Sequence, residues 1–366
     1  MIEKTSEVDI LETLFEGFLD KVIVTENLNF DEDTIVKDIE KISEEIVKEE
    51  GEYKQYIEEN LRSLGYRLRE DNRLNERVFL ANLERDYGYI FYHLELVYLL
   101  SVELGKCIHG KFDKDESPLI TVMTFNHVRA CSMLAEVLHL IKGGYGNGAI
   151  ARFRSLHELS VVSEFIFEKK EPAAEAFLDY LEVMKVKDAL YLKQLYGSEK
   201  KIEEVLKNYK NIKQKFILKY GIRFADEKSK CDYEWARGFL NINEKSFPSF
   251  AMIRSNINRK TGREQYKLSS NNIHSAPKSI ISNINTKTGY PIAGASNIGL
   301  AEPGNWSIYE MQIMNTQLMK LVLKSKDFSF IDIIKIQFII KNIQILCNYS
   351  YEKFGKIENI FKKNEG

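Results

Sequence analysis

Cysteine, proline and glycine are all scarce in this sequence, and each scarcity excludes a class of structure. The four cysteines lie far apart without a CxxC pair, so neither a disulfide framework nor a cysteine-based zinc site is indicated. Six prolines and twenty glycines in 366 residues leave long stretches without helix breakers. With 44% hydrophobic and 29% charged residues, the composition is that of a folded protein and not of a disordered one.

The sequence also lacks an excess of one charge and a long apolar run. Lysine and arginine (52) nearly balance aspartate and glutamate (54), which argues against passive coating of nucleic acid. The most apolar late segment, FIDIIKIQFIIKNIQIL, contains Asp332, Lys335 and Lys341, so it predicts a core helix and not a membrane span. The start, MIEKTSEVDILETLF, has no basic-then-apolar signal pattern. We therefore expect a cytoplasmic protein without membrane contact.

Several motifs of catalysis and cofactor binding are missing. There is no HExxH pair, no P-loop, no Rossmann glycine run and no GxSxG elbow. The six histidines show no paired-ligand spacing. We therefore expect neither a metal ion nor a cofactor.

The periodicity of the chain predicts an all-α fold, an antiparallel helical bundle with an N-terminal helical extension and one long irregular loop. The charged, Gly- and Pro-containing stretch HGKFDKDESPL suggests a boundary, so we expect an N-terminal helical region over 1–115 and a central bundle over 116–366. Ser117 followed by Pro118 is typical of a helix start. Helices are expected over 118–142, from about 151 to about 168 after a turn at GGYGNG, from 172 to 197, from 198 to 221, and over 304–325 and 329–362, with the loop at about 275–303.

A short apolar seam in the N-terminal region predicts an interaction surface. Ile35, Ile39, Ile42 and Ile46 alternate in steps of four and three, as in helices that pack in coiled-coil fashion. We expect this seam to contact a second copy of the chain or another protein.

The stretch ARFRSLHELS, residues 151–160, carries the first candidate site. Arg154 and Glu158 stand at an i, i+4 spacing, so on a helix they share a face and can pair. Apolar neighbours such as Phe153 and Leu156 would remove part of that face from water, where a charge needs a partner. Such a pair is either a structural ion pair or part of a reaction centre, and the residue types leave both open.

Arg152 and His157 form a second pattern in the same stretch. Their R-x4-H spacing resembles the motif of the HEPN ribonucleases, helical bundles that cleave RNA with an arginine and a histidine. Five residues turn an α-helix by about 500°, so the two side chains do not share one strict face. A core or surface histidine is the simpler interpretation of His157.

A third pattern lies in YKLSSNNIHSAP. Tyr266, Ser270 and His274 recur at steps of four and would line one helical face. A histidine among hydroxyls is suited to proton transfer because its usual pKa is near neutrality, although it would serve equally as a helix-end cap.

The order of GNGAIARFRSLHELSVVSEFI, AFLDYLEVMKV, DYEWARGF and YKLSSNNIHSA resembles the bacterial family called domain of unknown function 5677, over roughly residues 118–280. The resemblance implies a helical fold and brings no established activity. It implicates Arg154, Glu158 and His274 together, and it makes His157 less central because the family is usually apolar there. The family pattern maps onto Arg154, Ser155 and Glu158, onto Tyr233 and Trp235, and onto Ser270 and His274.

Two functions remain. In the first, the protein is a metal-independent ribonuclease-like enzyme with a toxin or defence role. Arg154 would then hold a phosphate, His274 would move a proton, and Glu158 would orient the arginine or the histidine, while Arg152, Tyr266 and Ser270 would contact RNA. In the second, the same residues form a buried structural network in a non-catalytic binding or oligomerisation module. An open pocket would favour the enzyme, and full enclosure the module.

Overall fold

The computed structural model describes residues 16, 52–112, 117–197, 199–257, 259, 262–273, 284 and 292–364. Every element within these ranges is a helix, which confirms the predicted all-α fold. None of the described helices combines the length and apolar character needed to cross a bilayer.

The chain divides into two compact units within its first described helix, α3 (Glu52–His109). Met1–Asn82 form one unit and Leu83–Gly366 the other. From Leu83 onward α3 carries fully buried side chains such as Leu94 and Leu104, so this part of the helix contributes to the core of the second unit. The division after residue 115 that the Gly- and Pro-containing stretch predicted stays a prediction, because residues 113–116 lie outside the described residues.

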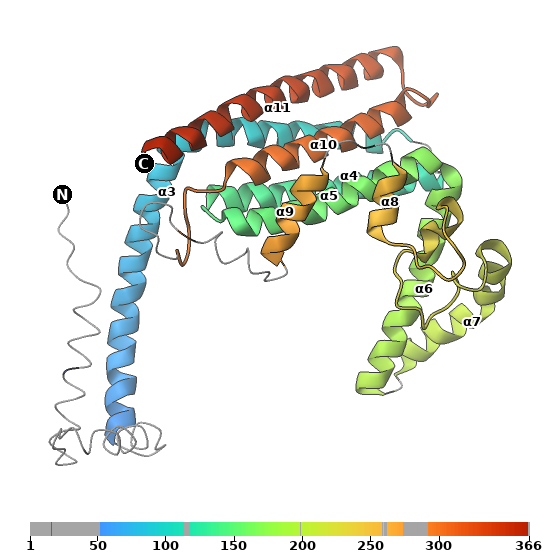
Figure 1. The fold of residues 1–366 in the computed structure, drawn as a ribbon, viewed down its shortest axis with the longest axis horizontal. Coiled ribbons are helices and arrows are strands. Elements are labelled where there is room, and N and C mark those ends of the chain that lie inside the picture. Colours follow the sequence, from blue (N-terminus) through green and yellow to red (C-terminus); the bar gives the residue numbers. More distant parts are fainter. Residues whose placement is uncertain are drawn as a thin grey trace. The chain divides into compact units, whose positions relative to one another are not determined.

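A helical hairpin, α4 (Pro118–Lys142) and α5 (Gly146–Lys169), forms the centre of the second unit (Figure 1). The hydroxyl of Ser117 accepts a hydrogen bond from the amide of Ile120 at 3.2 Å, as its position before Pro118 predicted. Gly144 takes the left-handed conformation that the tight turn requires, with φ 81°.

Two C-terminal helices complete the core. α10 (Ala301–Val322) packs against α4, α5 and α11 (Phe330–Asn364), as predicted for the last two helices (Figure 1). Gly304 of α10 lets the helix approach its neighbours closely, since a Cβ there would lie 2.6 Å from the ring of Phe354 and 3.4 Å from Leu94.

The helices that follow the hairpin build a surface against α5. α6 (Glu171–Tyr196) and α7 (Lys200–Tyr220) pack on each other, as predicted. The 3-10 helix η1 (Glu234–Phe239) packs on α6 through Trp235, whose ring lies 5.0 Å from that of Phe177. α8 (Phe250–Asn256) and α9 (Arg263–Ile273) both pack on α5. These short elements bring residues of the irregular region to the face that carries Arg154.

Candidate functional site

Arg154, Glu158 and Tyr266 form a closed hydrogen-bonded triangle between α5 and α9. Arg154 Nε donates to Glu158 Oε1 at 3.1 Å, and Arg154 Nη2 donates to the Tyr266 hydroxyl at 3.0 Å. The same hydroxyl donates to Glu158 Oε1 at 3.1 Å. The i, i+4 pair expected from the sequence is therefore present, and Tyr266 joins it from a distant part of the chain.

This triangle is accessible to solvent. The Arg154 side chain is 17% exposed and that of Glu158 is 34% exposed. Burial raises the pKa of Tyr266 despite the opposing hydrogen bond from Arg154, so its hydroxyl stays protonated at neutral pH. Burial, with the nearby Glu158 carboxylate, also raises the pKa of Tyr233 to about 12. The group thus offers neutral phenols and an arginine to a ligand.

A second arginine, Arg254 of α8, reaches the same tyrosine. The guanidinium of Arg154 lies 4.9 Å from the centre of the Tyr266 ring, and that of Arg254 lies 5.4 Å from it. Arg254 Nη1 is buried and has no hydrogen-bond partner within the described part of the chain. Two guanidinium groups therefore converge on one phenol, an arrangement suited to an anion.

The other residues expected at this site are placed differently or are not described. Ser270 lies on α9, and its hydroxyl donates to the carbonyl of Tyr266 at 2.8 Å, so in this structure it supports the helix. Arg152 forms an ion pair with Glu136 of α4, with Nη2 2.9 Å from Oε1, apart from the triangle. His274 lies outside the described residues, as does most of the loop at 275–303 that was expected to cover the site.

The C-terminal part of that loop, residues 292–300, is described and contacts the turn between α4 and α5. The amide of Ser296 donates to the carbonyl of Gly144 at 2.9 Å. A Cβ on Gly146 would lie 2.6 Å from the carbonyl oxygen of Gly299, so this contact requires glycine at the start of α5.

A second polar group lies beneath the triangle and is fully enclosed. His157 Nδ1 donates to Glu310 Oε1 of α10 at 2.8 Å, and Arg259 Nη1 donates to Glu310 Oε2, also at 2.8 Å. His157 and Glu310 are buried, and the Arg259 side chain is only 4% exposed. Although burial raises the pKa of Glu310, the hydrogen bond from His157 and the charge of Arg259 outweigh it and hold that pKa below its usual value. Glu310 is therefore ionised at neutral pH.

Arg259 extends this network along α5. Its Nε donates to Glu164 Oε2 at 2.8 Å and its Nη2 to Ser160 Oγ at 2.9 Å. Nearby, Gly262 has φ 91°, and a Cβ there would lie 2.5 Å from His157 Cε1, so only glycine fits against the imidazole.

These contacts separate the two residues of the R-x4-H pattern. Arg152 pairs with α4, whereas His157 points into the core and pairs with α10. His157 is thus a core histidine in the described structure, in agreement with its simpler interpretation. Its ring centroid lies 5.7 Å from that of Tyr266, so the enclosed network and the exposed triangle share one tyrosine.

Sequence reasoning missed five members of these two groups: Ser160, Glu164, Arg254, Arg259 and Glu310. A signal existed for Glu310, because it shares a helix with apolar residues such as Ile308 and Met311, and an unpaired carboxylate in such surroundings is costly. Arg254 and Arg259 lie in an irregular region without periodicity, so no local pattern singled them out. Among the described residues, no cluster of three or more His, Cys, Asp or Glu is arranged to hold a metal ion.

Comparison with known proteins finds one similarity, in the middle of the chain. Residues 121–291 match the model of a family of unknown function (DUF5677), which confirms the resemblance drawn from the sequence. No curated protein and no solved structure matches the chain. The match covers the triangle and the short helices that build it.

Proposed function

We propose that the protein is a metal-independent enzyme that binds and cleaves RNA, at the site built by the region, residues 121–291, that matches the model of the family of unknown function DUF5677. In this proposal the phosphate lies against Arg154, Tyr266 and Arg254. RNA cleavage would serve a toxin-like or phage-defence role.

The convergence of two arginines on Tyr266 carries the proposal. Arg154 has a carboxylate partner in Glu158, whereas the buried Nη1 of Arg254 has no hydrogen-bond acceptor among the described residues. A buried charged donor without an acceptor is costly, and a phosphate oxygen would satisfy it with a charge-assisted hydrogen bond. Glu158 fixes the guanidinium of Arg154 in place and so reduces the entropy lost when a phosphate binds.

The chemistry assigned to this site is cleavage by the RNA's own 2′-hydroxyl. That oxygen attacks the adjacent phosphorus, the bond from phosphorus to the 5′-oxygen breaks, and a cyclic phosphate and a 5′-hydroxyl form. A base removes the proton from the 2′-hydroxyl and an acid protonates the leaving 5′-oxygen; we assign proton transfer to His274. Arg154 and Arg254 would stabilise the charge that develops on the phosphate oxygens.

A second candidate is a non-catalytic binding module whose polar residues are structural. The enclosed His157–Glu310–Arg259 network favours it, because these charges are paired and shielded from solvent. The triangle favours the enzyme, since Arg154 and Glu158 remain partly exposed.

Replacing Arg254 with alanine tests the proposal. Loss of one charge-assisted hydrogen bond should weaken binding of single-stranded RNA by about ten- to a hundredfold, measured by fluorescence anisotropy at fixed salt. The matched control is Arg129→Ala, which removes an exposed arginine of α4 outside the site and should change affinity little. Equal weakening by the two variants would contradict a phosphate site at Arg254.

Cleavage is tested separately from binding. His274→Ala should keep RNA affinity but lose the cleavage of labelled RNA in the presence of a chelator, and it should relieve any growth arrest caused by expressing the protein. Intact RNA after prolonged incubation with the wild-type protein would favour the binding module.

A further inference from the structure

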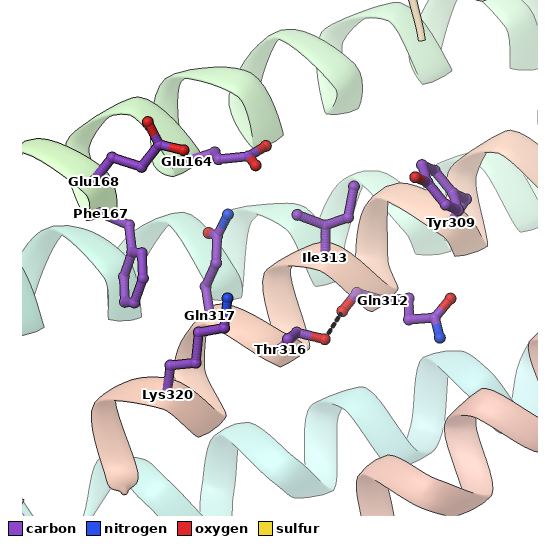
Figure 2. Close-up of a pocket in the computed structure, with 9 residues that line it drawn as sticks. All are labelled: Glu164, Phe167, Glu168, Tyr309, Gln312, Ile313, Thr316, Gln317 and Lys320. Atoms are coloured by element: carbon purple, nitrogen blue, oxygen red, sulfur yellow. Dashed lines mark hydrogen bonds between the residues drawn. The ribbon is translucent and has the colours of Figure 1, made fainter. Parts of the chain in front are cut away.

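A pocket distinct from the arginine site opens between α5 and α10 (Figure 2). Its volume is about 410 Å³, within the range that holds a small ligand. Glu164, Phe167 and Glu168 line it from α5, and Gln317 and Lys320 line it from α10.

The side-chain amide of Gln317 is buried in this pocket without a hydrogen-bond partner among the described residues. Gln317 is 4% exposed, and neither its amide nitrogen nor its amide oxygen has a hydrogen-bond partner within the described ranges. Figure 2 shows this side chain pointing from α10 toward Glu164 and Glu168. A buried amide left unpaired costs free energy at both atoms, so the pocket favours a group that presents an acceptor and a donor side by side.

The carboxylates above Gln317 favour a further donor. Glu164 is already bound by Arg259 at 2.8 Å, whereas no hydrogen bond among the described residues influences the carboxylate of Glu168. Burial, followed by the like charge of Glu164, raises the pKa of Glu168. An N–H donor from a ligand would stabilise the ionised form of this carboxylate.

Lysines beside the pocket argue against a cationic ligand. The ammonium groups of Lys320 and Lys324 lie 5.8 and 5.6 Å from the centre of the Phe167 ring. A cation entering beside Phe167 would be repelled by both, whereas a neutral planar ring with a carbonyl oxygen would not. These contacts favour a neutral planar group that carries one acceptor and two donors on one edge.

We propose that this pocket binds the 2-amino-4-oxopyrimidine edge that guanine shares with the pterins. Gln317 Nε2 would donate to the ring carbonyl, the adjacent ring N–H would donate to Gln317 Oε1, and the exocyclic amino group would donate to Glu168. Adenine can pair with the amide through its amino group and ring nitrogen, but it has no second amino group to donate to Glu168, so we expect it to bind more weakly. If the guanine belongs to RNA, this inference deepens the proposed function and rests on it for the source of the base.

Calorimetric titration of the full chain with nucleosides tests the proposal. Nucleosides carry no phosphate, so the arginine site does not contribute. Guanosine should bind, inosine, which lacks the amino group, at least tenfold more weakly, and adenosine more weakly still. Neopterin, titrated in parallel, distinguishes a pterin from a nucleobase as the source of the edge.

Variants locate the binding. Gln317→Leu should weaken guanosine binding at least tenfold, while Gln344→Leu on α11, outside the pocket, should not. If Gln317→Leu does not fold, Glu168→Gln at the rim takes its place and should reduce the preference for guanosine over inosine.

The outcomes separate this proposal from the previous one. Equal affinity for guanosine and adenosine, or no binding of guanosine and neopterin, would overturn the pocket assignment whatever RNA does. Guanosine binding together with RNA affinity unchanged by Arg254→Ala would support the pocket and contradict the phosphate site. Binding of neopterin but not of guanosine would support recognition of the 2-amino-4-oxopyrimidine edge, and it would show that the ligand is a pterin and not a base of RNA.

Discussion

At the scale of single residues, His127 is a polar group placed inside an apolar core. Its Nε2 donates to Asn315 Oδ1 at 2.8 Å, and Asn315 Nδ2 donates to Ser101 Oγ at 2.8 Å. Burial lowers the pKa of His127 to about 4, against the opposing hydrogen bond with Asn315. The imidazole is therefore neutral at physiological pH and links α4, α10 and α3.

The depressed pKa predicts a pH window for stability. Between pH 6.5 and 4 the unfolded chain binds a proton at His127 that the folded chain does not, so stability falls as the pH falls through this range. The loss should reach roughly 3 kcal/mol. Urea unfolding at several pH values should show a smaller loss for His127→Gln than for the wild type, whereas His139→Gln, an exposed histidine of the same helix, should behave like the wild type. If stability depends on pH equally in the two variants, His127 is not the group whose protonation destabilises the fold.

At the scale of elements, the enclosed network holds an irregular segment to two helices. Glu310 of α10 accepts from His157 of α5 and from Arg259, which lies between α8 and α9. This segment brings α9, and with it Tyr266, to the face of Arg154. The network thus connects the stability of the core to the geometry of the exposed triangle.

Removing one charge from this network should be strongly destabilising. Glu310→Gln leaves Arg259 without its most buried counter-charge and should lower the free energy of unfolding by about 3–5 kcal/mol, measured by urea denaturation. Glu264→Gln, at an exposed position of α9, should change stability little. If Glu310→Gln lowers the free energy of unfolding by less than about 1 kcal/mol, Arg259 does not depend on this carboxylate and the prediction is wrong.

At the scale of the whole molecule, self-association stays a prediction. The seam Ile35, Ile39, Ile42 and Ile46 lies outside the described residues. Its spacing still predicts burial against another helix, because four exposed isoleucines would form an apolar patch.

Two substitutions by aspartate test whether the seam is an interface. Ile39→Asp combined with Ile42→Asp should lower the mass measured by light scattering or abolish folding in thermal melts, since charges cannot be buried in an apolar seam. Ile222→Asp, at an exposed position outside the seam, serves as the control. An unchanged mass and melting temperature for the double variant would show that the seam is not an interface.

The sequence by itself determined the helices and the local pair at the site. Ser117 with Pro118, the glycines after Lys142 and the apolar periods predicted α4 and the end of α5 closely, because caps, turns and periodicity act between near neighbours. The start of α5 was wrong, since the helix begins at Gly146 and includes part of the glycine-rich stretch that was expected to be a turn. For the same reason Arg154 and Glu158 were predicted to share a face, one turn apart on a helix.

Only the tertiary structure decided which distant side chains meet. Tyr266 reaches Arg154 across 112 positions and Glu310 reaches His157 across 153 positions. The sequence also gave no sign that the amide of Gln317 would be buried without a partner. These contacts depend on the rotation and crossing angle of whole helices when they pack. Both are set by the burial of many side chains together, so no single stretch of the sequence predicts them.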